Sequence, residues 1–180
     1  MLRIVKDNAK SLHSPSKPVE LPVSKEDQDT IKEMYEYLLL TQDEDFRAKN
    51  PKVREGVGLA APQIGINKQM CVVAYQEDDK LIKHLMINPR IIISSVRKCY
   101  LRAGEGCLSV DKDHPGYIVR DYKIEVDYID GETLEKVHVK AMGFEAIVMQ
   151  HEIDHLKGIL FYDHIDKNNP YAHPDNAIEI

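Results

Sequence analysis

Two histidines four residues apart, His151 and His155, are of a type and spacing that could bind a metal ion. Residues four apart lie on one face of an α-helix, about one turn apart. Glu152, which follows the first histidine, has the position of a general base in such sites. The alternative is an amphipathic surface helix whose histidines are incidental. The apolar neighbours Ile147 and Ile153 favour an inner helix, where buried histidines and carboxylates need partners.

Two histidines do not complete a catalytic metal site, which usually has three protein ligands and one position open for water. A known metallopeptidase pattern has a third histidine six residues after the second, but this sequence has Phe161 there. His164 lies nine residues after His155 and beyond the expected helix, so it is a weak candidate. The third ligand is therefore expected from another part of the chain.

Cys107 is the cysteine best placed for chemistry, because glycines on its N-terminal side allow close approach of the backbone. A strand is expected to begin directly after it. Cys71 and Cys99 lie among strand-forming residues and are expected to be small core residues. One cysteine with two histidines is a known zinc arrangement, and thiolate also suits iron. A nucleophilic Cys–His pair is the competing interpretation, but it does not explain two histidines and a glutamate on one helix.

The glycine-bracketed segment GVGLAAPQIG (56–65) superficially matches a dinucleotide-binding fingerprint. The charged residues before it do not form a strand, and Pro62 disfavours a phosphate-binding helix at that point. Nucleotide binding is therefore rejected. Gln63 is an isolated polar side chain in this apolar segment. Its amide could donate to a developing oxyanion, or it could hydrogen-bond the loop to itself.

Two helices are expected to position these groups, over residues 25–42 and 143–157. The first has apolar residues at helical spacing and Ser24 as its cap. The second carries the two histidines and is followed by a glycine. Residues 1–24 are expected to be an extended arm over the domain, and residues 43–55 a loop.

Strand patterns fill the middle of the chain, at 69–75, 81–88 and 90–100. The runs 117–130 and 133–141 are expected to form a hairpin. Two helices without regular strand–helix alternation indicate an α+β fold. The expected architecture is an antiparallel, strand-rich domain packed around a C-terminal metal-binding helix, with a second long helix near the N-terminus.

Composition limits the possible functions of the chain. Its 180 residues fit a single domain spanning 1–180, and its net charge of −6 excludes nucleic-acid binding through phosphates as the main activity. No apolar run approaches the roughly 18 residues of a membrane span. The N-terminus has no apolar signal core, and three cysteines suit reduced thiols. We expect a cytoplasmic protein without DNA or membrane partners.

Three segments resemble, in order, the signature motifs of the peptide deformylases: GVGLAAPQIG (56–65), EGCLSV (105–110) and QHEIDH (150–155). The ordered triple is far more specific than any one motif. The resemblance covers most of the chain, and the long segment before the second motif resembles the bacterial type 2 subclass. The N-terminal arm departs from the usual basic pattern, so nothing specific is expected of it.

The resemblance implies hydrolytic removal of the formyl group from the N-terminal formylmethionine of new polypeptides. It implies one divalent metal ion, Fe²⁺ in the cell, with Ni²⁺, Co²⁺ or Zn²⁺ able to occupy the site. It also implies formylmethionyl nascent peptides as substrate, near the ribosomal exit tunnel. The implied metal ligands are Cys107, His151 and His155.

The resemblance also assigns further roles. Glu152 is implied as general base and acid, Gln63 and the Leu108 N–H as oxyanion donors, and Gly58 as a neighbour of the substrate. From their positions, Val57, Leu59 and Ile147 are expected to line an apolar pocket for the methionine side chain.

Asp154 is expected to orient a ligand or to pair with a cation such as Arg120. The alternative functions are a zincin-type metallopeptidase and a non-catalytic structural zinc module.

Overall fold

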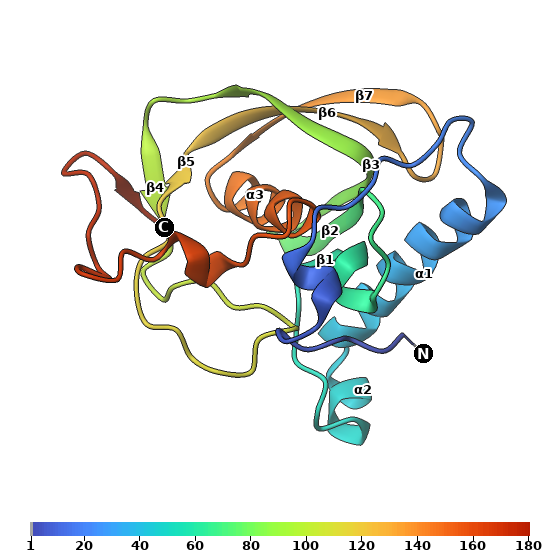
Figure 1. Cartoon of the computed structure of the whole chain (residues 1–180), viewed down its shortest axis with the longest axis horizontal. Coiled ribbons are helices and arrows are strands. Elements are labelled where there is room, and N and C mark those ends of the chain that lie inside the picture. The colour runs from blue at the N-terminus through green and yellow to red at the C-terminus, as the bar shows by residue number, and fades with distance from the viewer. Residues whose placement is uncertain (1) are drawn as a thin grey trace.

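The computed structural model of the protein describes residues 2–180. Its main sheet has five antiparallel strands in the order β1-β2-β3-β6-β7, and a second sheet has the order β5-β4-β8. The long strands β3, β6 and β7 arch over helix α3, and α1 lies at one side of the sheet (Figure 1). The strands are β1 Gly58–Ala60, β2 Met70–Glu77, β3 Lys80–Ser94, β4 Lys98–Tyr100, β5 Arg120–Asp121, β6 Lys123–Asp130, β7 Lys136–Met142 and β8 Ile178–Glu179.

Helix α1 (Lys25–Gln42) spans the predicted range, and Ser24 caps it by accepting a hydrogen bond from the Asp27 N–H. Its apolar face carries Ile31, Met34 and Leu38, all fully buried. These side chains pack against one face of the sheet, in a cluster that includes Leu59 of β1. A helix with one apolar stripe is stable in this position because the stripe is removed from water.

Helix α3 (Phe144–Leu156) lies inside the molecule, and every residue from Ala146 to Leu156 is buried. It packs on the opposite face of the sheet from α1. Neighbouring residues of β2 alternate between the two faces and therefore contact the two helices in turn. Cys71 and Val73 of β2 belong to the cluster around α3, and Val72 belongs to the cluster around α1. The α+β fold around a C-terminal helix is thus confirmed.

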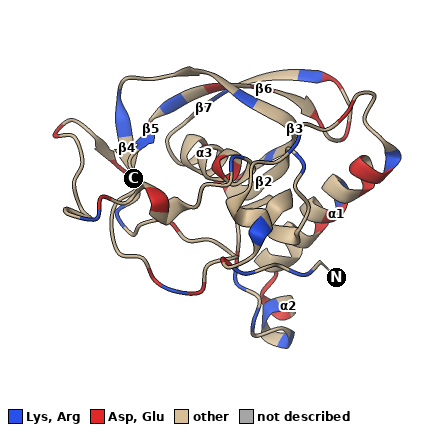
Figure 2. Ribbon diagram, in the orientation of Figure 1, with Lys and Arg blue, Asp and Glu red and all other residues tan. Residues whose placement is uncertain are grey.

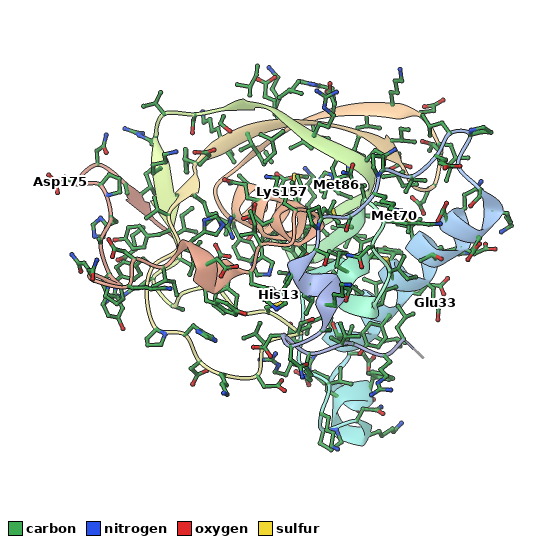
Figure 3. The ribbon with its side chains drawn as sticks, in the orientation of Figure 1. His13, Glu33, Met70, Met86, Lys157 and Asp175 are labelled. Atoms are coloured by element: carbon green, nitrogen blue, oxygen red, sulfur yellow. The ribbon has the colours of Figure 1, made fainter. Side chains whose placement is uncertain are left out.

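The interior also contains methionine side chains from the strands of the sheet. Met70 and Met86 are fully buried, and Figure 3 shows them within the fold, whereas Glu33 of α1 points outward. Methionine fills irregular space well because its side chain is unbranched and flexible. No helix among residues 2–180 is long and apolar enough to cross a bilayer.

The expected loop at 43–55 contains a short helix, α2 (Glu44–Lys49), and the prediction was wrong there. Asp43 caps this helix, since its carboxylate accepts from the Phe46 N–H at 2.6 Å. None of its residues is buried. A helix without a buried face leaves no hydrophobic periodicity in the sequence, so only the cap could have indicated it.

The predicted break at Asn88-Pro89 is also wrong, because β3 continues through it with a bulge between Ile87 and Arg90. Asn88 has a positive φ of 52°, and its side chain exchanges two hydrogen bonds with the backbone of Val19, at 2.7 and 2.9 Å. A bulge leaves a residue out of the ladder, so a proline without an N–H is tolerated there.

A third correction concerns the residues after Cys107, which form a turn instead of a strand. The Val110 N–H donates to the Cys107 carbonyl at 3.2 Å. The predicted hairpin of β6 and β7 is present, with Val126 opposite Val139.

The N-terminal arm, described from Leu2 onward, covers the domain as expected. It contains one 3-10 turn at Lys10–His13, and Leu12 is fully buried. The Val5 N–H donates to the Gln63 carbonyl, and the Ser16 N–H to the Leu156 carbonyl at the end of α3, both at 2.8 Å. The arm therefore touches two of the three sequence segments that carry candidate catalytic groups.

Candidate metal centre

Cys107, His151 and His155 come together, with one possible ligand atom of each within 4.8 Å of the others. Both histidines project from the same face of α3, as their spacing predicts, and Cys107 comes from the loop between β4 and β5. The Cys107 Sγ lies 3.3 Å from Nε2 of His155. All three side chains are buried.

The chemistry of these three donors fits a divalent metal ion such as zinc or iron. Nδ1 of His151 lies 2.8 Å from Oε2 of Glu105, which leaves Nε2 as its ligand atom. Burial lowers the pKa of His155 well below its ordinary value, and the neighbouring His151 acts in the same direction. His155 is therefore neutral, as a metal ligand must be.

Glu105 contacts a candidate ligand, a contact that was not predicted from the sequence. It accepts two hydrogen bonds from Arg120, from Nε at 2.8 Å and from Nη2 at 2.9 Å, besides its contact with His151. Burial acts to raise the pKa of Glu105, but the hydrogen bonds from Arg120 and His151 outweigh it and lower the pKa to about 2. The carboxylate is therefore ionised while it orients His151. A glutamate two residues before a candidate ligand was the available signal.

Arg120 also donates a hydrogen bond to Asp154 of α3. This is the pair that the sequence suggested. Nε2 of His164 lies 2.7 Å from the same carboxylate. His164 thus contacts Asp154 and is not part of the ligand cluster. Burial acts to raise the pKa of Asp154, but His164 and Arg120 hold it well below its usual range. One buried arginine therefore pairs with two carboxylates behind the metal centre.

Glu152 lies beside the ligands and is almost completely buried. Its Oε2 has no hydrogen-bond partner among residues 2–180. Desolvation raises its pKa to about 7; the charge of His151 opposes this shift and that of Glu105 adds to it. A carboxyl group with a pKa near neutrality can both accept and return a proton.

Gly58 is required by the position of Glu152. A Cβ at residue 58 would stand 2.2 Å from Oε1 of Glu152. Any larger residue would therefore displace the carboxylate.

Gln63 lies in the 3-10 turn Ala61–Ile64, where its side chain has two contacts. Its Oε1 accepts from the Ala60 N–H at 2.7 Å, and its Nε2 donates to the Cys107 Sγ at 3.4 Å. The first bond fixes the amide so that its NH₂ group faces the metal centre. The two interpretations from the sequence, a loop bond and a donor in the site, are therefore compatible.

A cavity of about 280 Å³ opens onto this centre. Val57, Gly58 and Ile147 line it, as does Leu108. Leu59 does not: it is fully buried in the cluster against α1, so its expected place in the pocket is corrected. Alternate residues of a strand point to opposite faces, which turns Leu59 away from its neighbour Gly58. The remaining lining residues include Leu101, Phe144, Val148, Cys107, His151 and Glu152.

Residues 1–171 match the family model described as polypeptide deformylase. The sequence is 47% identical to a peptide deformylase of Lacticaseibacillus casei, over 100% of this chain and 98% of the relative. It is 46% identical to peptide deformylase 2 of Bacillus subtilis, over 100% of this chain and 97% of the relative.

Solved structures agree with the sequence comparisons. The fold is similar to the crystal structure of a peptide deformylase from Ehrlichia chaffeensis, with a TM-score of 0.74, 32% identity and coverage of 93% of this chain and 89% of that one. A probable peptide deformylase from Synechococcus phage S-SSM7 gives a TM-score of 0.70 and 36% identity, over 91% and 99% of the two chains. The chain belongs to the peptide deformylase family of metal-dependent hydrolases.

Proposed function

We propose that the protein hydrolyses the formyl amide at the N-terminal formylmethionine of newly made polypeptides and releases formate. Family membership supports the reaction class. The observation that carries the proposal is that one apolar cavity ends at both the three-donor centre and the buried carboxyl group of Glu152. The ligands we propose are Cys107, His151 and His155.

A bound divalent metal supplies Lewis acidity there and lowers the pKa of water. We propose Fe²⁺ as the ion in the cell, with Ni²⁺, Co²⁺ or Zn²⁺ able to replace it. The support is the donor set, because one thiolate and two imidazoles suit all four ions. Glu105 supports the set by fixing the ring of His151.

Glu152 moves the proton in the proposed reaction. As general base it takes a proton from the attacking water, and as general acid it gives that proton to the departing amine. Its raised pKa, caused by desolvation, suits both steps near pH 7. The carboxylate is close to the reacting centre because Gly58 leaves room for it.

Two donors are proposed for the oxyanion that develops on the formyl oxygen when water attacks the formyl carbon. The first donor is Nε2 of Gln63, whose side-chain amide is oriented by the hydrogen bond from the Ala60 N–H. The second donor is the backbone N–H of Leu108. Loss of one donor of this kind typically lowers the rate by about 10²–10³.

Val57 and Ile147 are proposed as walls for the methionine side chain, with Gly58 beside the substrate backbone. A flexible thioether fills such a cavity well, and a charged side chain there would lose its hydration without a partner. A missing methylene costs about 1–3 kcal/mol in an apolar pocket.

The two alternatives have less support. A structural zinc site uses four protein ligands, whereas the buried group found among residues 2–180 has three. An endopeptidase of the zincin type shares the helix motif, but the relatives that cover the whole chain are peptide deformylases.

We also propose that residues 1–180 form one catalytic domain that acts in the cytoplasm on nascent chains near the ribosomal exit tunnel. Three free, buried cysteines fit a reducing compartment.

Formate release tests the proposed function, measured with formyl-methionyl, formyl-aspartyl and acetyl-methionyl peptides of otherwise identical sequence. We expect fast release from the first, slow release from the second, and little cleavage of the third, because its extra methyl has to fit where formyl has only hydrogen. Glu152→Gln should retain the metal and lose nearly all turnover. Equal rates on the formyl and acetyl peptides, or an active Glu152→Gln enzyme, would refute the proposal.

A further inference from the structure

The peptide group that joins Cys107 to Leu108 has two functional ends. In a trans peptide the C=O of one residue and the N–H of the next lie in one plane and point in opposite directions. Whatever binds the Cys107 carbonyl therefore also sets the direction of the Leu108 N–H. The proposed function gives that N–H the role of an oxyanion donor, and the inference below rests on that role.

Two donors hold the Cys107 carbonyl. One is the Val110 N–H, at 3.2 Å, which closes the turn after the cysteine. The other is Nη2 of Arg54, which also donates to the Val110 carbonyl at 2.8 Å. The Leu108 N–H donates to no group among residues 2–180, and Leu108 lines the catalytic cavity. The peptide is thus held at its carbonyl end and free at its N–H end.

Arg54 is itself held in place through the segment that precedes β1. Two residues later, the Gly56 N–H donates to Oγ1 of Thr41 at 3.2 Å, and the Gly56 carbonyl accepts from Nε2 of Gln42 at 2.8 Å. A Cβ at residue 56 would stand 2.9 Å from Cδ1 of Leu108. The segment therefore lies directly against the turn that Arg54 binds, and α1 anchors it.

We infer that Arg54 is a positioning residue for the oxyanion donor, acting through the Cys107–Leu108 peptide. Its guanidinium fixes the plane of this peptide by holding two carbonyls of the turn. Its charge also polarises the peptide, because a charge-assisted bond at the C=O strengthens the N–H at the other end as a donor. Arg54 also lines the cavity, and the role inferred here is indirect, through the Cys107–Leu108 peptide.

Arg54→Met tests the inference, and Arg102→Met is the matched control. Arg102 lies beside the same loop, but its side chain is 79% exposed and, among residues 2–180, it forms one ion pair, with Glu179 at 3.5 Å. We expect Arg54→Met to lower kcat about 10- to 100-fold, less than the loss of a donor outright. KM and metal content should change little, and the control should retain wild-type kcat.

The Leu108 amide gives a readout that does not depend on turnover. In the zinc-loaded protein, the NMR resonance of this amide should shift upfield in Arg54→Met, because a weaker bond at the Cys107 carbonyl polarises the N–H less. Arg54→Lys retains the charge but lacks the planar fork, so both kcat and the resonance should lie between wild type and Arg54→Met. If Arg54→Met does not fold, kcat and the Leu108 resonance of Arg54→Lys alone test the inference.

Wild-type kcat with an unmoved Leu108 resonance in either variant would overturn the inference. So would a loss of kcat that matches a loss of bound metal, because Arg54 would then merely hold the Cys107 loop. Glu152→Gln and Gln63→Ala separate this result from failure of the proposed function. If they remove activity while Arg54→Met does not, only the role of Arg54 is wrong; if they leave activity intact, the proposed function itself is wrong.

Discussion

The molecule has two clusters in which a histidine lies among carboxylates and a cation, and their surroundings differ. Behind the metal centre, Glu105 binds both His151 and Arg120. On the outer side of β6 and β7, Nδ1 of His138 lies 2.8 Å from Asp127 and its Nε2 lies 3.0 Å from Glu125, which also pairs with Lys140. The residue types are almost the same.

The two clusters differ in their exposure to solvent. The side chains of Glu105 and Arg120 are 4% exposed, whereas His138 is 44% exposed. Figure 2 shows acidic residues of α3 inside the fold and separate charged positions along β6 and β7. Water replaces any lost partner at the surface, but a buried charge that loses its partner stays uncompensated. Burial, more than composition, therefore decides how costly the loss of a partner is in the two clusters.

The largest contrast is expected for the histidines themselves. His151→Ala should lose most of the bound metal and nearly all deformylase activity, because two donors remain in a site that needs three. His138→Ala should retain both. Both variants are compared by their metal content, from mass spectrometry, and by their rate of formate release. A full metal complement in His151→Ala would exclude this residue as a ligand.

The next contrast concerns the cations. Arg120→Met leaves the carboxylates of Glu105 and Asp154 buried without their partner, which costs about 3–5 kcal/mol in the free energy of unfolding. Lys140→Met on β7 should change it by less than about 1 kcal/mol. Urea denaturation of both variants gives the comparison. A similar small loss in both would show that burial is not the deciding factor.

A smaller effect is expected for the glutamates. Glu105→Gln removes the carboxylate that orients His151 but can still accept a hydrogen bond, and metal affinity should fall about 10- to 100-fold. Glu125→Gln should leave affinity unchanged. Competition with a chelator of known affinity measures both, and equal affinities in the two variants would contradict the role of Glu105.

The smallest effect is expected at the surface. The hydrogen bond to Asp127, with Glu125 adding to it, raises the pKa of His138 above its ordinary value. Its contribution to stability is therefore complete below the unfolded pKa of about 6.5 and is lost as pH rises through the folded pKa. NMR titration should show the raised pKa, and Asp127→Asn should lower it. An unchanged pKa in Asp127→Asn would rule out that hydrogen bond as the cause.

The sequence predicted the parts of this molecule that repeat a local pattern. The bounds of α1 matched, and α3 differed by one residue at each end, because Ser24 caps the first helix, Gly158 follows the second, and both have many apolar residues. The expected proximity of Cys107, His151 and His155 was also found, since a motif on one helix fixes two of the three. These features depend on residues close together in the chain.

The features that the sequence did not predict depend on contacts that no local pattern encodes. The ion pair of Glu105 with Arg120 joins residues 15 positions apart, one in an irregular loop and the other at the start of β5. The orientation of Leu59 could not be read from a strand of only three residues, too short to show alternation. The bulge at Asn88 is fixed by Val19, 69 positions away, so the sequence indicated a break there instead.

The arm that covers the domain has a consequence for the order in which the protein folds during synthesis. Ser16 is made early on the ribosome, yet the carbonyl that it binds belongs to Leu156. Gly158, with a φ of +75°, also lies directly against the backbone of Ser14, where a Cβ would stand 2.8 Å from the Ser14 nitrogen. The arm is translated before α3 and must therefore wait for that helix before it can dock. Closure of so long a loop is slow, so docking of the arm belongs to the last stage of folding.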